Sequence, residues 1–433
     1  MHQLIVDFDI RLLSVVSYGP ASLEDMQLRY QYRIKPTAKQ RQALARAFGC
    51  ARVVYNDGLR LREDSFKVGL PFITDSELLR LVTTEAKKTP ERLWLTSVSA
   101  VVLQQSVADL HRAYRNYFRA IEELRTAHLE GKRAYLRVRR PRFKSKHYSQ
   151  AVRFTVNSRF RVLPNGRLRL PKVGNVHVRW SRPLPAEPSS VTITLDRAGR
   201  YHASFVVEVA EVPLPVADSA VGVDLGLSNF AALSTGEKVA NPRWLRQRER
   251  ALRRSQRNMG RKEKGSRNHE KARRKLACQH VKVADARRDF HHQLSTRLVR
   301  ENQVVAVETL NIAALGRSNL AKSLADAGWG QFTSMLRYKT AMAQRTLVKV
   351  DRWDPSSQLC SGCGARSGPK GWTGLQLRAW TCSRCAIVHD RDVNAAKNIL
   401  AAGRAVTACG PGVRPGVSQV VGDEAGTTPA VAV

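Results

Sequence analysis

The sequence predicts an α+β protein of about two or three domains. Three observations carry this prediction. Residues 37–129 show helical periodicity, residues 151–213 show short alternating strands, and two apolar strands begin a second region at 220–237 and 302–312. A chain of 433 residues, of which 43% are hydrophobic, can bury cores of this kind. We therefore expect several folded regions joined by short linkers.

The first region combines strands with an inserted helical segment. Alternating apolar residues in MQLRYQYRIK predict a strand that ends at Pro36, and amphipathic helices follow it over 37–129. Six short strands between 151 and 213 are separated by turn sequences such as PNGR, which is typical of a small antiparallel barrel or sandwich. The proline-rich stretch at 211–219 then marks a boundary before the second region.

The charge of the chain indicates a polyanionic partner. Lys and Arg number 73 against 36 Asp and Glu, which gives a formal net charge of +37. Nucleic acid is the abundant polyanion that would neutralise this excess. A basic membrane-surface protein is the competing interpretation, but no apolar run approaches the roughly 18 residues that a spanning helix needs.

The basic residues are densest at 241–275, where fifteen Lys and Arg accompany three Glu. Like charges one helical turn apart destabilise a helix, so this density favours contact with phosphates over an ordinary solvated helix pair. The connector at 132–149 contains no acid at all. The predicted nucleic-acid contacts are Arg246, Arg250, Arg253, Arg254, Arg257, Arg261, Lys262, Arg273 and Arg274 in the first stretch, and Arg139, Arg140 and Lys144 in the connector.

Three acidic residues stand at the ends of apolar elements in the second region. Asp224 ends one strand, Glu308 ends another, and Asp392 opens a helix. Carboxylates held close together repel one another, and Mg²⁺ relieves that repulsion because it prefers oxygen ligands. Two such ions can support phosphodiester hydrolysis. The plainer alternatives are a turn-forming role for Asp224 and helix capping by Asp392, and Asp390 competes with Asp392 for the third position.

Four cysteines have the spacing of a tetrahedral zinc site. Two C-x₂-C pairs lie 18 residues apart, in the pattern of structural Cys₄ zinc modules. Four thiolates leave no open coordination position, so we expect one structural zinc ion. The motif lies between Glu308 and Asp392, which makes it an insert in the acid-bearing region. The predicted ligands are Cys360, Cys363, Cys382 and Cys385.

Taken together, these motifs resemble the TnpB, or OrfB, family of insertion-sequence proteins, which are related to type V CRISPR effectors. The segments that carry the resemblance include VGVDLGLSNFAALSTGE, VVAVETLNI, SSQLCSGCG and WTCSRCAIVHDRDVNAAKNIL. The resemblance runs from about Met26 to the tail. It implies an RNA-guided DNA endonuclease whose catalytic residues are Asp224, Glu308 and Asp392, with Mg²⁺ as the catalytic metal and zinc as a structural one.

The resemblance also implies a domain order and partners. We expect a guide RNA, a double-stranded DNA target with a short adjacent motif, and a place in the prokaryotic cytoplasm in association with the nucleoid. A leader at 1–25 lies outside the resemblance, so translation starting at Met26 is a hypothesis. The expected parts are a wedge-type β-barrel (26–36 and 132–215), a helical recognition region (37–131), a RuvC-like RNase H fold (218–354 with the basic helical segment 241–300, then 389–403), a zinc-ribbon-type finger (355–388) and a disordered tail (404–433).

Other functions fit part of this pattern. A transposase of the RNase H fold that acts directly on DNA ends also needs three acids, and a catalytically silent guided repressor would need the same charge. A general RNA-binding protein would explain the charge but not the acids. The three acids together favour an active nuclease, and the sequence leaves the guide, the adjacent motif, the cut positions and the oligomeric state open.

Overall fold

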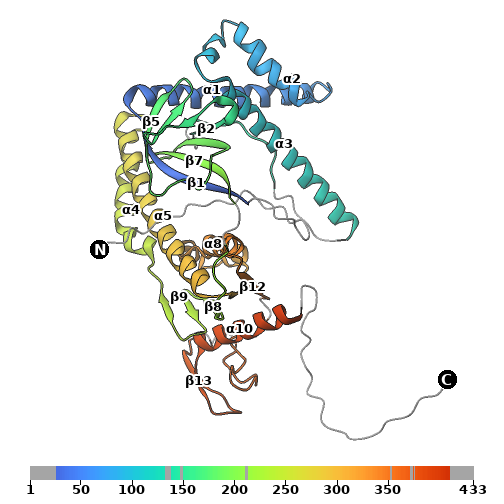
Figure 1. The fold of residues 1–433 in the computed structure, drawn as a ribbon, viewed down its shortest axis with the longest axis vertical. Coiled ribbons are helices and arrows are strands. Elements are labelled where there is room, and N and C mark those ends of the chain that lie inside the picture. The colour runs from blue at the N-terminus through green and yellow to red at the C-terminus, as the bar shows by residue number, and fades with distance from the viewer. Residues whose placement is uncertain are drawn as a thin grey trace, which may run out of the picture. The chain divides into compact units, whose positions relative to one another are not determined.

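The computed structural model contains two compact units (Figure 1). The first comprises Met1–Glu211 and Gln247–Asp289, and the second comprises Val212–Arg246 and Phe290–Val433. The expected leader and most of the expected tail lie outside the residues that the structure describes. No helix within the described residues is both long enough and apolar enough to span a membrane. The described residues are 26–131, 138–146, 150–209, 213–351, 354–370, 374 and 376–409.

The first unit is built on a seven-stranded antiparallel sheet with the order β2-β6-β7-β1-β5-β4-β3. The strand predicted at the start of the first region pairs with β7 from Met26 to Ile34, so it lies at the middle of the sheet. Tyr32, Trp180 and Phe205 form the aromatic core on one face, with ring centroids of Tyr32 and Trp180 4.7 Å apart. All the strands predicted over 151–213 are present. The strands are β1 (Met26–Lys35), β2 (Gln150–Thr155), β3 (Arg161–Val162), β4 (Arg167–Leu170), β5 (Gly174–Arg179), β6 (Ser190–Leu195) and β7 (Tyr201–Val209).

The helical insertion of the first unit follows β1 directly. Thr37 begins α1 with a capping box, in which the Thr37 hydroxyl accepts from the Gln40 backbone and the Gln40 side chain accepts from the Thr37 N–H. Helix α1 packs on α3 through side chains with no exposed surface, among them Leu44, Val54 and Leu110. The elements are α1 (Ala38–Lys67), α2 (Asp75–Leu79), η1 (Arg80–Glu85), η2 (Ala86–Lys88), η3 (Leu93–Ser97), α3 (Ala100–Leu129) and, after β2, η4 (Val156–Ser158).

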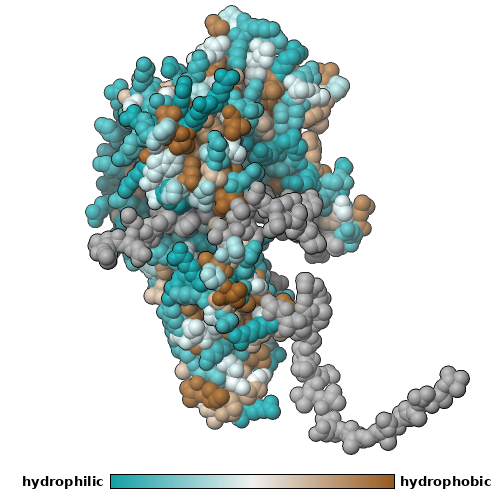
Figure 2. Space-filling view, viewed as in Figure 1, coloured by the Kyte–Doolittle hydropathy of each residue, from teal (hydrophilic) through white to brown (hydrophobic). Residues whose placement is uncertain are grey.

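The basic segment forms two helices, α4 (Trp244–Gly260) and α5 (Arg267–Glu301). Most of this segment belongs to the first compact unit, whereas we expected it within the second region. The physical reason is contact with the β6–β7 turn: Arg274 donates to the Ala198 carbonyl at 3.1 Å, and Asp285 accepts from Arg200 at 2.6 Å. Hydrophilic side chains dominate the surface over α4 and the adjoining part of α5 in Figure 2.

The second unit has a five-stranded sheet with the order β10-β9-β8-β11-β12. Strands β8, β11 and β12 are parallel, whereas β9 and β10 are antiparallel to their neighbours. Phe230 and Phe332 are fully buried at the centre of the core on one face, where their rings meet edge to face at 5.1 Å. The elements are β8 (Ala220–Leu225), β9 (Asn229–Leu233), β10 (Lys238–Ala240), β11 (Val304–Glu308), α6 (Ile312–Leu315), α7 (Ala321–Ala327), α8 (Trp329–Met342), β12 (Thr346–Val350), β13 (Ala379–Thr381), β14 (Val388–Asp390) and α10 (Arg391–Cys409).

Helix α10 lies across the sheet of the second unit at the level of β8 (Figure 1). It continues to Cys409, six residues beyond the end that we expected. Two glycines permit the close approach. A Cβ on Gly222 would lie 2.0 Å from the Ala396 carbonyl oxygen, and a Cβ on Gly403 would lie 2.7 Å from the Ala306 Cβ. The helix that carries Asp392 is therefore held at backbone contact with the strand that carries Asp224.

Substitution of Gly222 by alanine is expected to destabilise the second unit. The added Cβ must displace α10 backbone, because the Ala396 carbonyl is not the end of a flexible side chain. Overpacking of this kind lowers the free energy of unfolding by about 1–3 kcal/mol. Urea denaturation monitored by tryptophan fluorescence measures the change. The matched control is Gly330→Ala in α8, where the new Cβ would meet only Ile312 Cδ1 at 3.4 Å, so stability should not fall. Equal stability of both variants would contradict the close-packing argument.

Candidate active site and metal centre

Two of the predicted acids meet because their strands are parallel neighbours. Val223 on β8 is in register with Val307 on β11, so the next residue of each strand, Asp224 and Glu308, reaches the same edge of the sheet. The carboxyl ends of parallel strands commonly form ligand sites in such sheets. Strand pairing therefore brings together two acids that lie 84 positions apart in the sequence.

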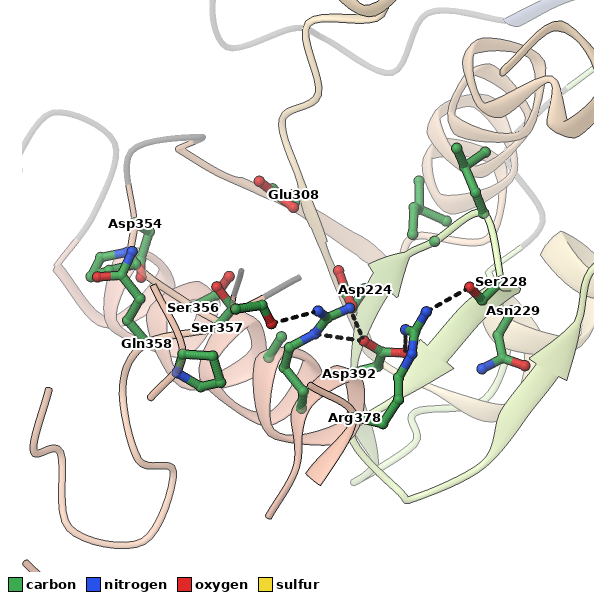
Figure 3. A pocket seen from close by; sticks show the side chains of 18 of the residues that line it. Asp224, Ser228, Asn229, Glu308, Asp354, Ser356, Ser357, Gln358, Arg378 and Asp392 are labelled. Carbon is green, nitrogen blue, oxygen red and sulfur yellow. Dashed lines mark hydrogen bonds and ion pairs between the residues drawn. The ribbon is translucent and has the colours of Figure 1, made fainter. Parts of the chain in front are cut away.

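These acids line a cavity of about 720 Å³ in the second unit. Asp392 enters it from the first turn of α10, so all three predicted catalytic acids share this cavity. Figure 3 shows Asp224 and Asp392 close to each other, with Glu308 at the end of its strand. The wall is mostly polar and includes the segment that follows β12. Further lining residues are Ser228, Asn229, Asp354, Ser356, Gln358, Arg366, Arg378 and Arg391.

The carboxylates of Asp224 and Glu308 are partly buried and uncompensated. Neither makes a hydrogen bond or ion pair with any residue that the structure describes. Burial, together with the negative charges of Glu308 and Asp392, raises the pKa of Asp224 to about 7. Burial and the neighbouring Asp354 likewise raise the pKa of Glu308. Keeping two buried carboxylates ionised side by side costs free energy, and a bound cation would offset that cost.

Asp392 has a different environment from the other two acids. Its side chain is 15% exposed and forms ion pairs with Arg391 at 2.9 Å and Arg378 at 3.3 Å. Arg378 also donates to the Ser228 hydroxyl at 2.9 Å, and Figure 3 shows this link across the cavity. The guanidinium groups orient the Asp392 carboxylate.

The structure separates the roles of the two neighbouring aspartates. Asp390 accepts a hydrogen bond from the Val393 N–H at 3.0 Å, which caps α10, and it pairs with Lys238 of β10. Asp390 does not line the cavity, whereas Asp392 does. Helix capping, which we had considered for Asp392, is performed by Asp390.

Asp354 is a fourth carboxylate in the cavity that sequence reasoning missed. It follows β12, the parallel strand beside β11, and its side chain has no hydrogen-bond or ion-pair partner among the described residues. Burial and Asp351 raise its pKa. The signal in the sequence was the alternating TLVKV ahead of it, which indicates a strand ending four residues before this acid.

The four predicted zinc ligands converge. Their sulfur atoms all lie within 4.8 Å of one another, and the Sγ–Sγ distances are 3.5 Å for Cys360 and Cys385 and 3.7 Å for Cys363 and Cys382. A tetrahedral site with Zn–S bonds of about 2.3 Å has sulfur atoms roughly 3.8 Å apart. The donor set and its spacing therefore fit a zinc ion. The His389 imidazole lies 3.0 Å from Cys360 Sγ and packs at a tilt against the Trp380 ring, with the ring centroids 4.8 Å apart.

A basic groove of about 870 Å³ lies in the first unit. Its two carboxylates are already paired, Asp196 with Arg200 and Glu270 with Arg273, each at 2.6 Å. Burial and the neighbouring Arg200 lower the pKa of Arg33 at the groove wall, so positive charges are crowded there. The cationic residues that line the groove are Arg33, Lys35, Arg41, Lys146, Arg197, Arg200, Lys271, Arg273 and Arg274.

The other predicted nucleic-acid contacts lie outside this groove. Lys144 packs its ammonium 3.9 Å from the Tyr55 ring centroid, and Arg140 lies over Phe66. Arg246 does not line the groove. It lies in the second unit, where its backbone N–H donates to the Asp326 carboxylate. The remaining predicted contacts are exposed. Arg139 lies in the connector, and those along α4 and the following turn are Arg250, Arg253, Arg254, Arg257, Arg261 and Lys262.

Comparison with known protein families adds three matches. A model described as "Probable transposase", OrfB_IS605, matches residues 204–319. A Cas12f1-like TNB domain model matches residues 329–399, which include the cysteine cluster, and an OrfB helix-turn-helix model matches residues 26–69.

Relatives match over nearly the whole chain. A Streptomyces pristinaespiralis protein, which bears the provisional name RNA-guided DNA endonuclease, is 43% identical over 91% of this chain and 93% of its own length. The Escherichia coli K12 protein InsQ, with the same provisional name, is 30% identical over 89% of this chain and 95% of its own. The fold resembles that of Cas12f1 in a complex with guide RNA and target DNA, with a TM-score of 0.52 at 12% identity, over 87% of this chain and 98% of that one. The chain therefore belongs to the OrfB, or TnpB, family of insertion-sequence proteins.

Proposed function

We propose that this protein is a transposon-associated, RNA-guided DNA endonuclease that hydrolyses phosphodiester bonds with Mg²⁺. The observation that carries the proposal is the convergence of Asp224, Glu308 and Asp392, from three separate elements, on one cavity. The names of the relatives support a guided nuclease, and the basic groove supports a nucleic-acid partner. A catalytically silent repressor would not need two uncompensated carboxylates in one cavity.

The second unit would be the RuvC-like RNase H domain. Its sheet supports this assignment, because three parallel strands are extended by an antiparallel pair, and the acids lie at the carboxyl ends of β8 and β11 and on a helix packed against them. The four-cysteine module would be its zinc-ribbon-type insert. The antiparallel sheet of the first unit would be the wedge-type barrel, and α1–α3 the recognition helices.

The cavity suits metal-assisted hydrolysis of DNA. Mg²⁺ bound there would activate water and stabilise the leaving oxygen. Asp224 and Glu308 would hold it, since their carboxylates have no other partner among the described residues, and Asp392 would complete the set. Arg378 and Arg391 lie at the same wall and would offset the negative charge of an incoming phosphodiester.

The partners would be a guide RNA from the mobile element and a double-stranded DNA target, in the cytoplasm and on the nucleoid. The test is to express the gene with its native downstream flank, purify the protein and sequence the bound RNA. One dominant RNA should extend beyond the boundary of the element. Its end should direct Mg²⁺-dependent cleavage of a matching plasmid beside a short motif. Random host RNA, with cleavage of unmatched DNA, would overturn the guided mechanism.

We expect the basic groove to contact the RNA backbone. Lys35 and Lys271 line it and pair with no residue that the structure describes, so the double variant Lys35→Ala/Lys271→Ala removes two free charges. Loss of two phosphate contacts should reduce the slope of log Kd against log salt by about 1.4, that is about 0.7 per contact with single-stranded nucleic acid. Filter binding of the co-purified RNA at several salt concentrations measures the slope.

The matched control for the groove is Lys67→Ala/Lys88→Ala. These lysines are exposed but already paired with Asp64 and Glu85, so their charges are locally neutralised. The control should keep the wild-type salt slope. An unchanged slope in the groove variant would show that RNA binds elsewhere on the protein.

A further inference from the structure

Two buried asparagines attach the helix that carries Asp392 to the first half of the cysteine motif. Asn394 and Asn398 lie one turn apart on α10, and these residues are 1% and 9% exposed. Residues four apart on a helix share one face. That face of α10 meets the segment 356–361, which contains Cys360.

The contacts are hydrogen bonds to backbone on both sides of the cysteine. Asn394 accepts from the Ser361 N–H at 2.8 Å and donates to the Leu359 carbonyl at 2.7 Å. Asn398 donates to the carbonyls of Leu359 and Ser356, both at 2.7 Å. A buried polar group that loses its partner costs about 1–3 kcal/mol, so the segment and the helix are held at one separation.

A second set of contacts ties the start of α10 to the same module. His389, which lies against Cys360 Sγ, immediately precedes the Asp390 cap of α10. The Arg391 N–H donates to the Arg378 carbonyl at 2.9 Å, and Arg378 also pairs with Asp392. The first turn of α10 therefore has its position set by both halves of the cysteine module.

The same segment forms part of the cavity wall. Ser356, Ser357 and Gln358 line the cavity and lie directly between Asp354 and the Leu359 carbonyl that both asparagines contact. The distance between this wall and Asp392 thus depends on the asparagine hydrogen bonds. Apolar side chains of similar size would fill the space but would remove the asparagine partners of the Ser361 N–H and of the Ser356 and Leu359 carbonyls.

We propose that Asn394 and Asn398 are positioning residues that couple the four-cysteine module to the carboxylate cluster. With Cys360 held in the module, the asparagines place Asp392 and the 354–358 wall at the spacing that a divalent cation requires. This inference rests on the proposed function of the cavity. It assigns to the cysteine module a role in metal affinity at the carboxylates, in addition to local stability.

The test uses the RNA-free full-length protein with the variant Asn398→Leu, which keeps side-chain volume and removes both donated hydrogen bonds. Zinc content is measured by elemental analysis, and Mn²⁺ affinity by isothermal titration calorimetry. We expect about one zinc per chain and a Mn²⁺ affinity lower by about 10–100-fold, the usual effect of losing an outer-shell partner. Cleavage by the guide complex should recover at high metal concentration. The control is Lys397→Leu at the adjacent exposed position, which should bind Mn²⁺ with wild-type affinity.

Asn394→Asp is the second variant, because it keeps an acceptor for the Ser361 N–H and replaces the donor to the Leu359 carbonyl by a carboxylate oxygen. If Asn398→Leu loses zinc, the inference is instead tested by the Mn²⁺ affinity of zinc-loaded Asn394→Asp, which should be lower than that of the wild type. Wild-type Mn²⁺ affinity in a zinc-loaded variant overturns the inference. Asp224→Ala serves as the reference variant. If Asp224→Ala binds Mn²⁺ with wild-type affinity, the proposed function of the cavity fails. If Asp224→Ala loses Mn²⁺ binding while the zinc-loaded asparagine variants keep it, only the positioning role is rejected.

Discussion

Replacement of Asp224 by alanine should reduce the rate of guided DNA cleavage by more than about a hundredfold, because we propose that it is a direct metal ligand, and such a ligand should matter at least as much as the outer-shell partners that cost 10–100-fold. Asp224 lines the same cavity as Glu308 and Asp392, and burial together with the charges of these two acids raises its pKa to about 7. Asp224 does not line the basic groove, so RNA and DNA binding should stay unchanged. Single-turnover cleavage and binding of a matched target measure the two properties separately.

The isosteric variant Asp224→Asn separates charge from shape. It keeps the volume at the end of β8 but lacks the negative charge that a divalent cation needs, so it should be as inactive as the alanine variant. Asp218→Ala is the matched control, since Asp218 is exposed just ahead of the same strand and lines no part of the cavity. Cleavage at the wild-type rate by either Asp224 variant would remove this cavity as the active site.

Replacement of Cys382 by serine should release the zinc ion that we propose for the four-cysteine cluster and unfold the cysteine module. Cys382 is 1% exposed and lies 3.7 Å from Cys363 in a cluster whose sulfur spacing fits tetrahedral coordination. The binding energy of a structural zinc site is folding energy, so three remaining ligands cannot hold the local structure. Zinc should fall from about one equivalent per chain to nearly none, and limited proteolysis should cut within 355–388. Both are measured on the full chain.

Cys278→Ser is the control for this experiment. Cys278 is a partly buried cysteine of α5 that takes no part in the cluster, so its loss should leave zinc content and protease resistance unchanged. Full zinc content in Cys382→Ser would show that the cluster does not need this ligand. Because Arg378 of the module pairs with Asp392, cleavage should also fall in Cys382→Ser, whereas it should persist in the control.

Much of the fold was readable in the sequence because its periodicities are local. The strands of 151–209, the strand at 26–35 and the helices of 38–129 all appear where the apolar spacing predicted them. The cysteine cluster was equally readable, since the spacing of two C-x₂-C pairs prescribes a tetrahedral site. The family resemblance, which the relatives confirm, also rested on these short motifs.

Long-range packing decided what the sequence left open. The register of β8 and β11 brings Asp224 and Glu308 to the same edge of the sheet. Strand β12, which we had not predicted, pairs with β11 and leads to Asp354, the fourth carboxylate of the cavity. The hydrogen bond from the Val393 N–H identifies Asp390 as the cap of α10, a role that the sequence alone could not assign between two aspartates separated by one residue.

The sequence by itself determined the classes of residue: a basic chain, acids at the ends of apolar elements, and a zinc-type cysteine motif. Only the tertiary structure decided which of these meet. Most of α4 and α5 belongs to the first unit, where Arg274 and Asp285 of α5 bond to the β6–β7 turn. Helix α10 packs at backbone contact with β8 at Gly222. The physical reason is that side-chain periodicity records the local burial of each element, whereas the pairing of distant elements depends on the complementary shape and charge of surfaces that exist only after folding.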